Sequence, residues 1–179
     1  MMTKEAFIKK YGSFAIQSAK GTGISPLLIL SQAYLESGGA KSKLASVHYN
    51  FFGIKADKNW NGKKVNLLTR EQRPDGSDFY VNAYFRKYDN PSQSFSDHIK
   101  FLKNNPRYTK AGLFSYPDNY QKQADTLQKA GYATDISYAS KLTSIANSFK
   151  DTYDKIVSGA TSIAPLILLF GFLLYWKNV

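Results

Sequence analysis

The sequence of 179 residues contains no cysteine. This absence excludes a scaffold of disulfide bonds, a zinc site built from thiolates and a cysteine nucleophile. Histidine is scarce too, and neither His48 nor His98 has a second histidine or a carboxylate at the spacing of metal ligands. We therefore expect both histidines to be solvent-facing or structural, and we expect no metal site. No phosphate-binding or dinucleotide-binding glycine motif occurs, so no cofactor is expected either.

Acidic residues are few compared with basic ones. The chain has 13 Asp and Glu against 24 Lys and Arg, which gives a formal net charge of +11. Such a charge suits an anionic partner, whether nucleic acid, lipid headgroups or a cell-wall polymer. The basic residues are dispersed and no recognition helix lies among them, so we expect no nucleic acid. The segment from Asp57 to Gly62 copies half of a calcium loop, but Leu68 occupies the twelfth position, which favours a turn.

Charge is missing altogether from residues 156–176. This segment has the length of a membrane-spanning helix, and its last residues Tyr175 and Trp176, followed by Lys177, are typical of a membrane interface. We therefore predict a soluble domain over 1–155, one C-terminal transmembrane helix over 156–176 in a lipid membrane, and a short tail over 177–179. Small residues near the start of the segment would let two such helices associate, namely Ser158, Gly159, Ala160 and Ser162.

The first 155 residues have a mostly helical pattern. Apolar residues recur at helical spacing, and Ser25-Pro26 and Asn90-Pro91 are typical of helix starts. The exception lies between 63 and 88, where two strand-like runs flank the turn signal Pro74-Asp-Gly-Ser77. We therefore predict a mainly α fold, with a helical body and an inserted β-hairpin lobe that together form a cleft.

Glutamate is the scarcest acid, with Glu5, Glu36 and Glu71 alone. Glu36 ends an apolar helix, where partial desolvation and the negative end of the helix dipole both raise the pKa of a carboxyl. A carboxyl that stays protonated near neutral pH is the proton donor that glycosidic cleavage needs. Position alone leaves open an exposed helix-end glutamate. Glu71 ends the first strand of the hairpin, from which a second carboxylate would reach across the cleft.

Five sequence blocks follow one another between about residues 4 and 150. They are Leu30-Ser-Gln-Ala-Tyr-Leu-Glu-Ser-Gly38, Asn50-Phe-Phe-Gly-Ile-Lys55, Phe85-Arg-Lys-Tyr-Asp-Asn-Pro-Ser-Gln-Ser-Phe95, Asn105-Pro-Arg-Tyr108 and Gly131-Tyr-Ala-Thr-Asp135 with Tyr138-Ala-Ser-Lys141. Together they resemble the glucosaminidase family of peptidoglycan hydrolases, glycoside hydrolase family seventy-three, which includes flagellar and autolysin-type domains. The first block alone is shared with lytic transglycosylases and goose-type lysozymes. The second and the last block make the narrower assignment.

This resemblance implies a lysozyme-like α+β fold with a small β-lobe, and it implies catalytic roles for three residues. Glu36 matches the general acid of the family, and Tyr132 matches its active-site tyrosine. Glu71 is the best match to the second carboxylate, although the surrounding residues depart from the usual pattern and leave Asp75 or Asp78 as alternatives.

Substrate-binding residues are expected around the second block. The resemblance implies that Asn50 and Phe52 line the floor of the cleft, and that Gly53 permits a tight turn there. Sugar rings also need apolar platforms, and the aromatic side chains of Tyr49 and Trp60 are candidates for that role.

The implied activity is cleavage of the β-1,4 bond between N-acetylglucosamine and N-acetylmuramic acid by a membrane-anchored endo-β-N-acetylglucosaminidase. Two carboxylates more than about 6.5 Å apart would predict inversion at the anomeric carbon, a closer pair would predict retention, and the N-acetyl group of the substrate offers a third route. The alternatives are a muramidase, a lytic transglycosylase, or an inactive wall-binding membrane protein.

The expected location follows from the anchor and from the start of the chain. The first residues lack the apolar core of a secretory signal. Insertion by the C-terminal segment alone would therefore leave the catalytic domain in the cytoplasm, where it has no peptidoglycan to cleave. We therefore predict a bacteriolytic protein in the virion membrane of a membrane-containing phage, used for cell-wall penetration or lysis, with the bacterial cell envelope as the alternative.

Overall fold

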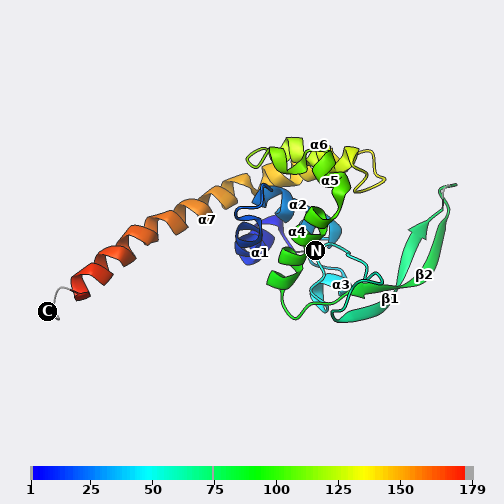
Figure 1. Cartoon of the computed structure of the whole chain (residues 1–179), viewed down its shortest axis with the longest axis horizontal. Coiled ribbons are helices and arrows are strands. Elements are labelled where there is room, and N and C mark those ends of the chain that lie inside the picture. Colours follow the sequence, from blue (N-terminus) through cyan, green and yellow to red (C-terminus); the bar gives the residue numbers. More distant parts are fainter. Residues whose placement is uncertain (1, 74, 176–179) are drawn as a thin grey trace.

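The computed structural model describes residues 2–73 and 75–175, and of 71, 72 and 160–175 it describes the backbone alone. Most of these residues form a helical body, and a two-stranded antiparallel sheet extends from it (Figure 1). The elements are α1 (Lys4–Ala19), α2 (Pro26–Glu36), α3 (Lys43–Ser46), β1 (Lys64–Gln72), β2 (Asp78–Arg86), α4 (Pro91–Asn104), α5 (Pro106–Lys110), the 3₁₀ helix η1 (Leu113–Ser115), α6 (Tyr120–Lys129) and α7 (Tyr138–Tyr175).

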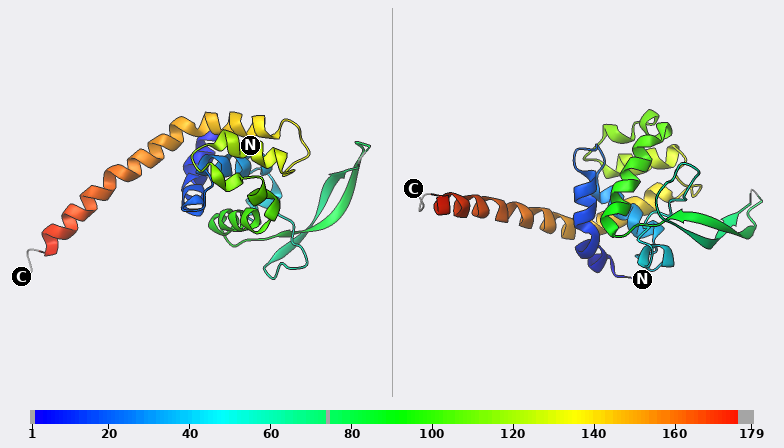
Figure 2. Two further views of the ribbon diagram at one scale, coloured as in Figure 1. Left: turned by 45° about the horizontal axis from the view of Figure 1, so that its top comes forward. Right: turned by 60° about the horizontal axis from the view of Figure 1, so that its bottom comes forward.

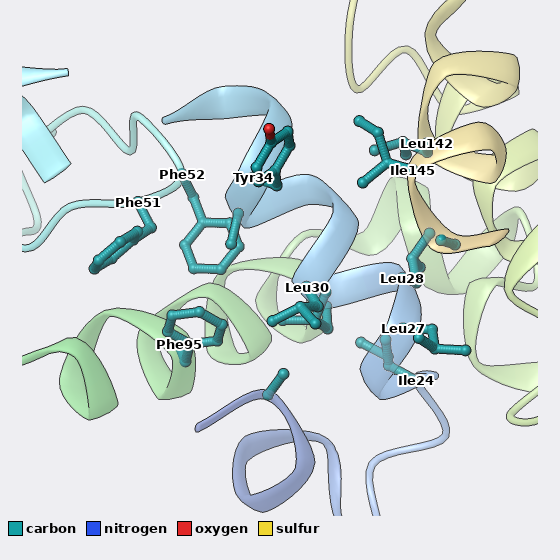
Figure 3. Close-up of a cluster of buried hydrophobic side chains, with 14 of the residues drawn as sticks. Ile24, Leu27, Leu28, Leu30, Tyr34, Phe51, Phe52, Phe95, Leu142 and Ile145 are labelled. Carbon is teal, nitrogen blue, oxygen red and sulfur yellow. The ribbon is translucent and has the colours of Figure 1, made fainter. Parts of the chain in front are cut away.

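Helix α2 is the buried centre of the helical body. It begins with Pro26 after the N-cap residue Ser25, and a proline in the first turn of a helix has no hydrogen bond to lose. Every residue from Leu27 to Tyr34 is buried, and α1, α6 and α7 pack around the helix. Figure 3 shows its leucines among apolar side chains of the neighbouring segments. Burying each one contributes about 1.5 to 3 kcal/mol, so the end of α2 is held firmly in place.

Aromatic rings connect α1 and α7 to the segment that follows α3. The ring of Phe7 stacks on Phe149 with centroids 6.3 Å apart and meets the edge of Tyr34 at 5.1 Å. Phe51 lies 4.7 Å from the ring of Tyr11 and 5.6 Å from that of Phe95 in α4. Because Phe51 is fully buried, the residues next to it in the chain are fixed against the helical body.

The hairpin has the predicted position and pairing. Strands β1 and β2 pair in antiparallel register from Lys64 opposite Arg86 to Gln72 opposite Asp78. In the turn, the carboxylate of Asp75 accepts hydrogen bonds from both the backbone N–H and the hydroxyl of Ser77, at 2.9 and 2.7 Å. The two strands extend away from the helices, as the two views of Figure 2 show.

The predicted C-terminal transmembrane helix is wrong, and the predicted fold class is corrected accordingly. Among the residues whose side chains the structure describes, which end at Gly159, none of the helices combines the length and the apolar character needed to cross a membrane. The predicted span over 156–176 is not a separate helix, because α7 starts at Tyr138 and continues unbroken to Tyr175. The described first part of α7 packs on α1, α2 and α6 and carries charged residues, among them Lys150 and Asp154. The fold is a mixed α/β body with a small antiparallel sheet.

The other predictions that depended on the anchor change with it. The location in a virion membrane or in an envelope membrane, inferred from residues 156–176, is wrong for the same reason. The association of anchor helices was predicted from small residues, of which Ala160 and Ser162 have side chains outside the described part. Residue 176 and the expected tail over 177–179 also lie outside the described residues.

Candidate active site

Glu36 is the last residue of α2, and the chain turns sharply after it. Gly38 and Gly39 both have positive φ, at 59° and 63°, a conformation that residues with a Cβ rarely adopt. The backbone N–H of Gly39 donates to the carbonyl of Tyr34 at 2.8 Å, which satisfies one of the last carbonyls of the helix. The turn therefore leaves the Glu36 side chain at the end of a rigid, buried helix.

The carboxyl of Glu36 accepts a hydrogen bond from a buried tyrosine. The hydroxyl of Tyr138, at the start of α7, donates to Oε1 of Glu36 at 2.7 Å. Although Glu36 as a residue is exposed to solvent, its carboxyl end lies among protein atoms, and this burial raises its pKa above the ordinary glutamate value. The hydrogen bond from Tyr138 acts in the opposite direction and is the weaker influence. The pKa of Glu36 is thus shifted upward by burial, the direction predicted from its place at the end of an apolar helix.

Tyr132 lies beside this pair. Its ring stacks on that of Tyr138 with centroids 5.4 Å apart, and it lies 6.0 Å from the ring of Tyr108. Burial raises the pKa of the Tyr132 hydroxyl well above its ordinary value, and the charge of Glu36 adds to this effect. The segment is held from α5, because the guanidinium of Arg107 donates to the carbonyl of Gly131 at 3.0 Å. The structure thus brings together Glu36 and Tyr132, which lie far apart in the sequence.

Three residues that the sequence did not mark as part of the site belong to the surroundings of Glu36. They are Tyr138, Gln32 and His98, which are joined by hydrogen bonds and are almost completely buried. Gln32 precedes Glu36 by four residues in one helix, so their common helix face was a signal that could have been used. Tyr138 begins the Tyr138-Ala-Ser-Lys141 part of the last sequence block, which was a further signal, although it assigned the residue no role. His98 had no such signal, because tertiary packing alone brings it near.

Asn50, Phe52 and Gly53 form the segment between α3 and the hairpin. Asn50 is buried, and its amide donates to the carbonyls of Ile54 and Arg86 at 2.9 and 2.8 Å and accepts from the N–H of Ile54 at 3.1 Å. These bonds occupy its polar atoms with backbone groups. Phe52 stacks on His98 with centroids 3.9 Å apart, and exposed Gly53 has a φ of 65° with open space where a Cβ would stand. Of the three, Gly53 offers an exposed backbone beside a fixed aromatic ring.

The two predicted sugar platforms lie in different surroundings. Tyr49 has a positive φ of 54° and is 36% exposed, so its ring reaches solvent from a strained turn. Trp60 donates from its indole N–H to the carbonyl of Lys63 at 3.0 Å, and the guanidinium of Arg86 lies 4.4 Å from its ring. It lines two adjoining hollows of about 510 and 620 Å³ that share Asp97 and Lys100. The described contacts of Trp60 are with the base of the hairpin and not with Glu36.

Glu71, the residue predicted to supply the second carboxylate, is placed by the hairpin backbone. Glu71 lies in β1 opposite Phe79, and its side chain lies outside the described part. Of the two alternatives, Asp75 accepts both hydrogen bonds of the turn, which lower its pKa, and Asp78 forms an ion pair with Arg70 at 3.1 Å. Both aspartates thus have structural partners within the hairpin.

In the part of the chain that the structure describes, no three His, Asp or Glu side chains gather in a way that would hold a metal ion. The segment that copies half of a calcium loop forms a turn, in which Asp57 accepts the N–H of Asn59 at 2.8 Å. The chemistry that the site offers through its described side chains is that of an acid, Glu36, with two tyrosines beside it.

A family model described as glucosaminidase, mannosyl-glycoprotein endo-beta-N-acetylglucosaminidase, matches residues 12–151. The chain belongs to the glucosaminidase family. It is 36% identical over 147 residues to the peptidoglycan hydrolase FlgJ of Vibrio parahaemolyticus, a match that covers 77% of this chain and 45% of that protein. The chain therefore spans less than half the length of this relative.

Solved structures of the glucosaminidase family share the fold. The catalytic domain of the autolysin Auto from Listeria monocytogenes has a TM-score of 0.73 and 32% identity, and the match covers 86% of this chain and 89% of that one. The glycoside hydrolase domain of FlgJ from Salmonella typhimurium has a TM-score of 0.70 and 32% identity, with 90% and 97% covered. The chain thus carries a glycoside hydrolase domain, as the five blocks predicted. These relatives are bacterial proteins and give no support to the predicted phage role.

Proposed function

We propose that this protein is a peptidoglycan hydrolase that cleaves the β-1,4 bond between N-acetylglucosamine and N-acetylmuramic acid, with Glu36 as its general acid. The observation that carries this proposal is the carboxyl of Glu36 at the end of α2, where burial raises its pKa. Family membership and the similarity to peptidoglycan hydrolases support the choice of substrate. The net charge of +11 also suits a polymer that carries carboxylates.

In the proposed reaction, Glu36 transfers its proton to the glycosidic oxygen as the bond from that oxygen to the anomeric carbon breaks. The oxocarbenium-like carbon then receives the oxygen of a water molecule, and the second carboxylate accepts a proton from that water. One water molecule is consumed, the second carboxyl releases its proton to the solvent, and Glu36 regains a proton from the solvent for the next cycle. We assign the second carboxylate to Glu71, since Asp75 and Asp78 are each engaged within the hairpin.

The substrate is expected to lie over the surface that contains Glu36, Tyr132 and the exposed backbone of Gly53. Tyr132 is proposed to contact the sugar next to the broken bond, because its ring adjoins the Tyr138 ring that holds Glu36. Phe52 is proposed to support this surface from below through its stack on His98. Asn50 acts through the backbone of its segment, whereas Tyr49 and Trp60 are proposed to contact sugar rings farther along the strand.

The test is an analysis of the new chain ends in purified peptidoglycan after incubation with the full chain. Reduction with borohydride followed by mass spectrometry distinguishes the three possible products. Reduced N-acetylglucosamine ends support the proposal. Reduced muramic acid ends would show a muramidase, anhydromuramic ends would show a lytic transglycosylase, and unchanged peptidoglycan would contradict enzymatic activity on this substrate.

The matched control for the assignment of the acid compares two glutamates. Glu36→Gln removes the proton donor and is expected to abolish the new ends, because an amide cannot deliver a proton in this step. Glu5→Gln removes an exposed carboxylate that pairs with Lys9 on the surface of α1 and is expected to leave the activity unchanged. Full activity in Glu36→Gln would contradict the assignment.

The stereochemical course follows from the anomer that forms first. Proton NMR of a soluble glycan fragment during the first minutes of cleavage shows whether the anomeric configuration is inverted or retained. Inversion supports a water between the two carboxylates. Retention would support a covalent course or participation by the N-acetyl group of the substrate, and the proposed use of water by the second carboxylate would then apply to the second step.

A further inference from the structure

A row of buried polar side chains leads from α4 to the carboxyl of Glu36. Nε2 of His98 lies 3.1 Å from Oε1 of Gln32, and the amide nitrogen of Gln32 lies 3.2 Å from the hydroxyl of Tyr138. That hydroxyl lies 2.7 Å from Oε1 of Glu36. His98 and Gln32 have no exposed surface, and Tyr138 is 3% exposed. Three helices, α2, α4 and α7, thus contribute to one continuous hydrogen-bonded row.

The row has a single direction of donation. Tyr138 has one O–H, and if it donates to Glu36, its oxygen accepts from the amide of Gln32. The carbonyl oxygen of Gln32 then faces His98, so Nε2 of His98 carries the hydrogen. Burial lowers the pKa of His98 to about 3, which keeps the ring neutral. Every donor in the row therefore points toward Glu36.

The other titratable groups around Glu36 do not replace this hydrogen bond. Tyr132 comes from the segment between α6 and α7, and its hydroxyl is influenced by the charges of Tyr108 and Arg107 of α5. The guanidinium of Arg107 is bonded to the carbonyl of Gly131 and to the Tyr108 hydroxyl. Among the described side chains, the hydrogen bond recorded for the Glu36 carboxyl is thus the one from Tyr138.

We propose that Tyr138 is a positioning residue that occupies Oε1 of Glu36 and thereby places the catalytic proton on Oε2, and that Gln32 and His98 orient the Tyr138 hydroxyl. An oxygen that accepts a short hydrogen bond is a poor site for the proton, so the acid is left with one oxygen from which to donate. After the proton has left, the same hydroxyl stabilises the carboxylate that remains. The catalytic part of this inference rests on the proposed function.

The first test measures the pKa of Glu36 directly and needs no substrate. Because Glu5, Glu36 and Glu71 are the glutamates of the chain, labelling of glutamate at Cδ with ¹³C gives three carboxyl signals. The Glu36→Gln variant identifies the signal of Glu36. In Tyr138→Phe, loss of a donor to the charged form is expected to raise the pKa of Glu36 by about one pH unit. An unchanged or lowered pKa would overturn the proposal.

The matched control is a second buried tyrosine that donates to a carboxylate. The hydroxyl of Tyr88 donates to Oδ2 of Asp97 at 2.7 Å, and Tyr88 is 4% exposed. Tyr88→Phe therefore removes an equivalent hydrogen bond elsewhere in the protein, and the pKa of Glu36 is expected to stay as it was. If both variants move it equally, a general loosening of the structure explains the shift and the proposal fails.

A second variant tests the row behind Tyr138. Gln32→Met keeps an unbranched side chain of similar volume and removes the donor to Tyr138, so that its hydroxyl loses its orientation. The pKa of Glu36 is expected to rise by less than in Tyr138→Phe. The absence of any change in Gln32→Met would show that Gln32 and His98 do not orient the hydroxyl.

The activity test uses soluble peptidoglycan fragments and the full chain. In Tyr138→Phe, kcat is expected to fall on the order of tenfold with little change in KM, and the alkaline limb of the pH profile is expected to move upward with the pKa of Glu36. Loss through KM alone, or an unmoved limb, would contradict the positioning role. An inactive wild-type chain would contradict the proposed function, while the carboxyl titration would still decide the position of the proton.

Discussion

The helical body and the hairpin hold their carboxylates in different ways. Glu36 ends a helix whose preceding residues are buried, and a buried tyrosine bonds its carboxyl. Glu71 lies on a two-stranded sheet that projects from the body, with Leu68 and Tyr80 each 66% exposed. A hairpin of two strands has little stability of its own. The comparison indicates that the proposed acid, Glu36, is rigidly placed before substrate arrives, whereas the place of the proposed second carboxylate, Glu71, depends on how the hairpin is attached.

The attachment of the hairpin is concentrated at its base. The N–H of Arg86 donates to the carbonyl of Ile54 at 3.0 Å, and its guanidinium pairs with Asp97 of α4 at 2.8 Å. The side chain of Asn50 joins the same two segments. This arrangement explains why Asn50, predicted as a substrate-binding residue, is found among backbone groups. Its contribution is to fix the direction in which the hairpin leaves the body.

The largest effect is expected from removal of the acid itself. Glu36→Gln should lower kcat/KM for soluble peptidoglycan fragments by about 10² to 10⁴, the range typical of general acid catalysis. Its melting temperature should stay near that of the wild type, because the change removes a carboxyl that burial already disfavours in its charged form. A loss of kcat/KM below tenfold would show that Glu36, on the rigid helical body, does not supply the proton.

The body and the hairpin should differ strongly in their response to truncation of a leucine. Leu30→Ala removes a fully buried side chain of α2 and should destabilise the protein by about 2 to 5 kcal/mol. Leu68→Ala, on the exposed face of β1, should change the free energy of unfolding by less than about 0.5 kcal/mol. Urea denaturation followed by circular dichroism measures the free energy of unfolding of both variants. Equal losses of stability would contradict the contrast between the buried body and the exposed hairpin.

Removal of the second carboxylate should reduce the rate less than removal of the acid. Glu71→Gln is expected to lower kcat by roughly 10²-fold, near the lower end of the range for acid–base groups. Asp78→Asn, which removes the partner of Arg70 in the same hairpin, should leave kcat within about a factor of two. The reverse order of effects, measured on soluble fragments, would transfer the role from Glu71 to Asp78.

The smallest effect on catalysis is expected at Asn50, which joins the hairpin to the helical body. Asn50→Ala leaves the carbonyls of Ile54 and Arg86 without the amide donor and should cost about 1 to 3 kcal/mol. Because the hairpin then leaves the body less firmly fixed, kcat should fall several-fold while the pKa of Glu36 stays unchanged. A change in the carboxyl titration of Glu36 would show that the joint and the acid are not independent.

Local sequence signals predicted much of this molecule. The N-cap Ser25 with Pro26, the turn around Asp75 and the helix end at Glu36 are all set by residues close together in the chain, and the structure has each where it was expected. The hydrogen bond from Tyr138 to Glu36 spans 102 positions, and no local pattern encodes such a contact. The sequence pattern placed Tyr138 in the apolar stripe of a helix, and this pattern gives no indication that its hydroxyl has a polar partner.

The error at the C-terminus has a physical reason as well. The transmembrane helix over 156–176 was predicted from the length of this run and its lack of charge, without regard to the helix that precedes it. In the structure, α7 begins at Tyr138 and packs its first turns on α2 and α6 before it reaches this run. Hydropathy does not report where a helix begins, and the start of α7 depends on the packing of Tyr138 and Leu142 in the core.

The most direct test of the account compares two midpoints measured on the same full chain. One is the pKa of Glu36 from the ¹³C titration of its carboxyl, and the other is the alkaline limb of kcat/KM for soluble peptidoglycan fragments. The two midpoints are expected to coincide, and both are expected to lie above the ordinary pKa of glutamate, because burial raises the pKa of Glu36. A limb that lies well away from the Glu36 midpoint, or a Glu36 pKa at or below the ordinary value, would contradict its role as the general acid.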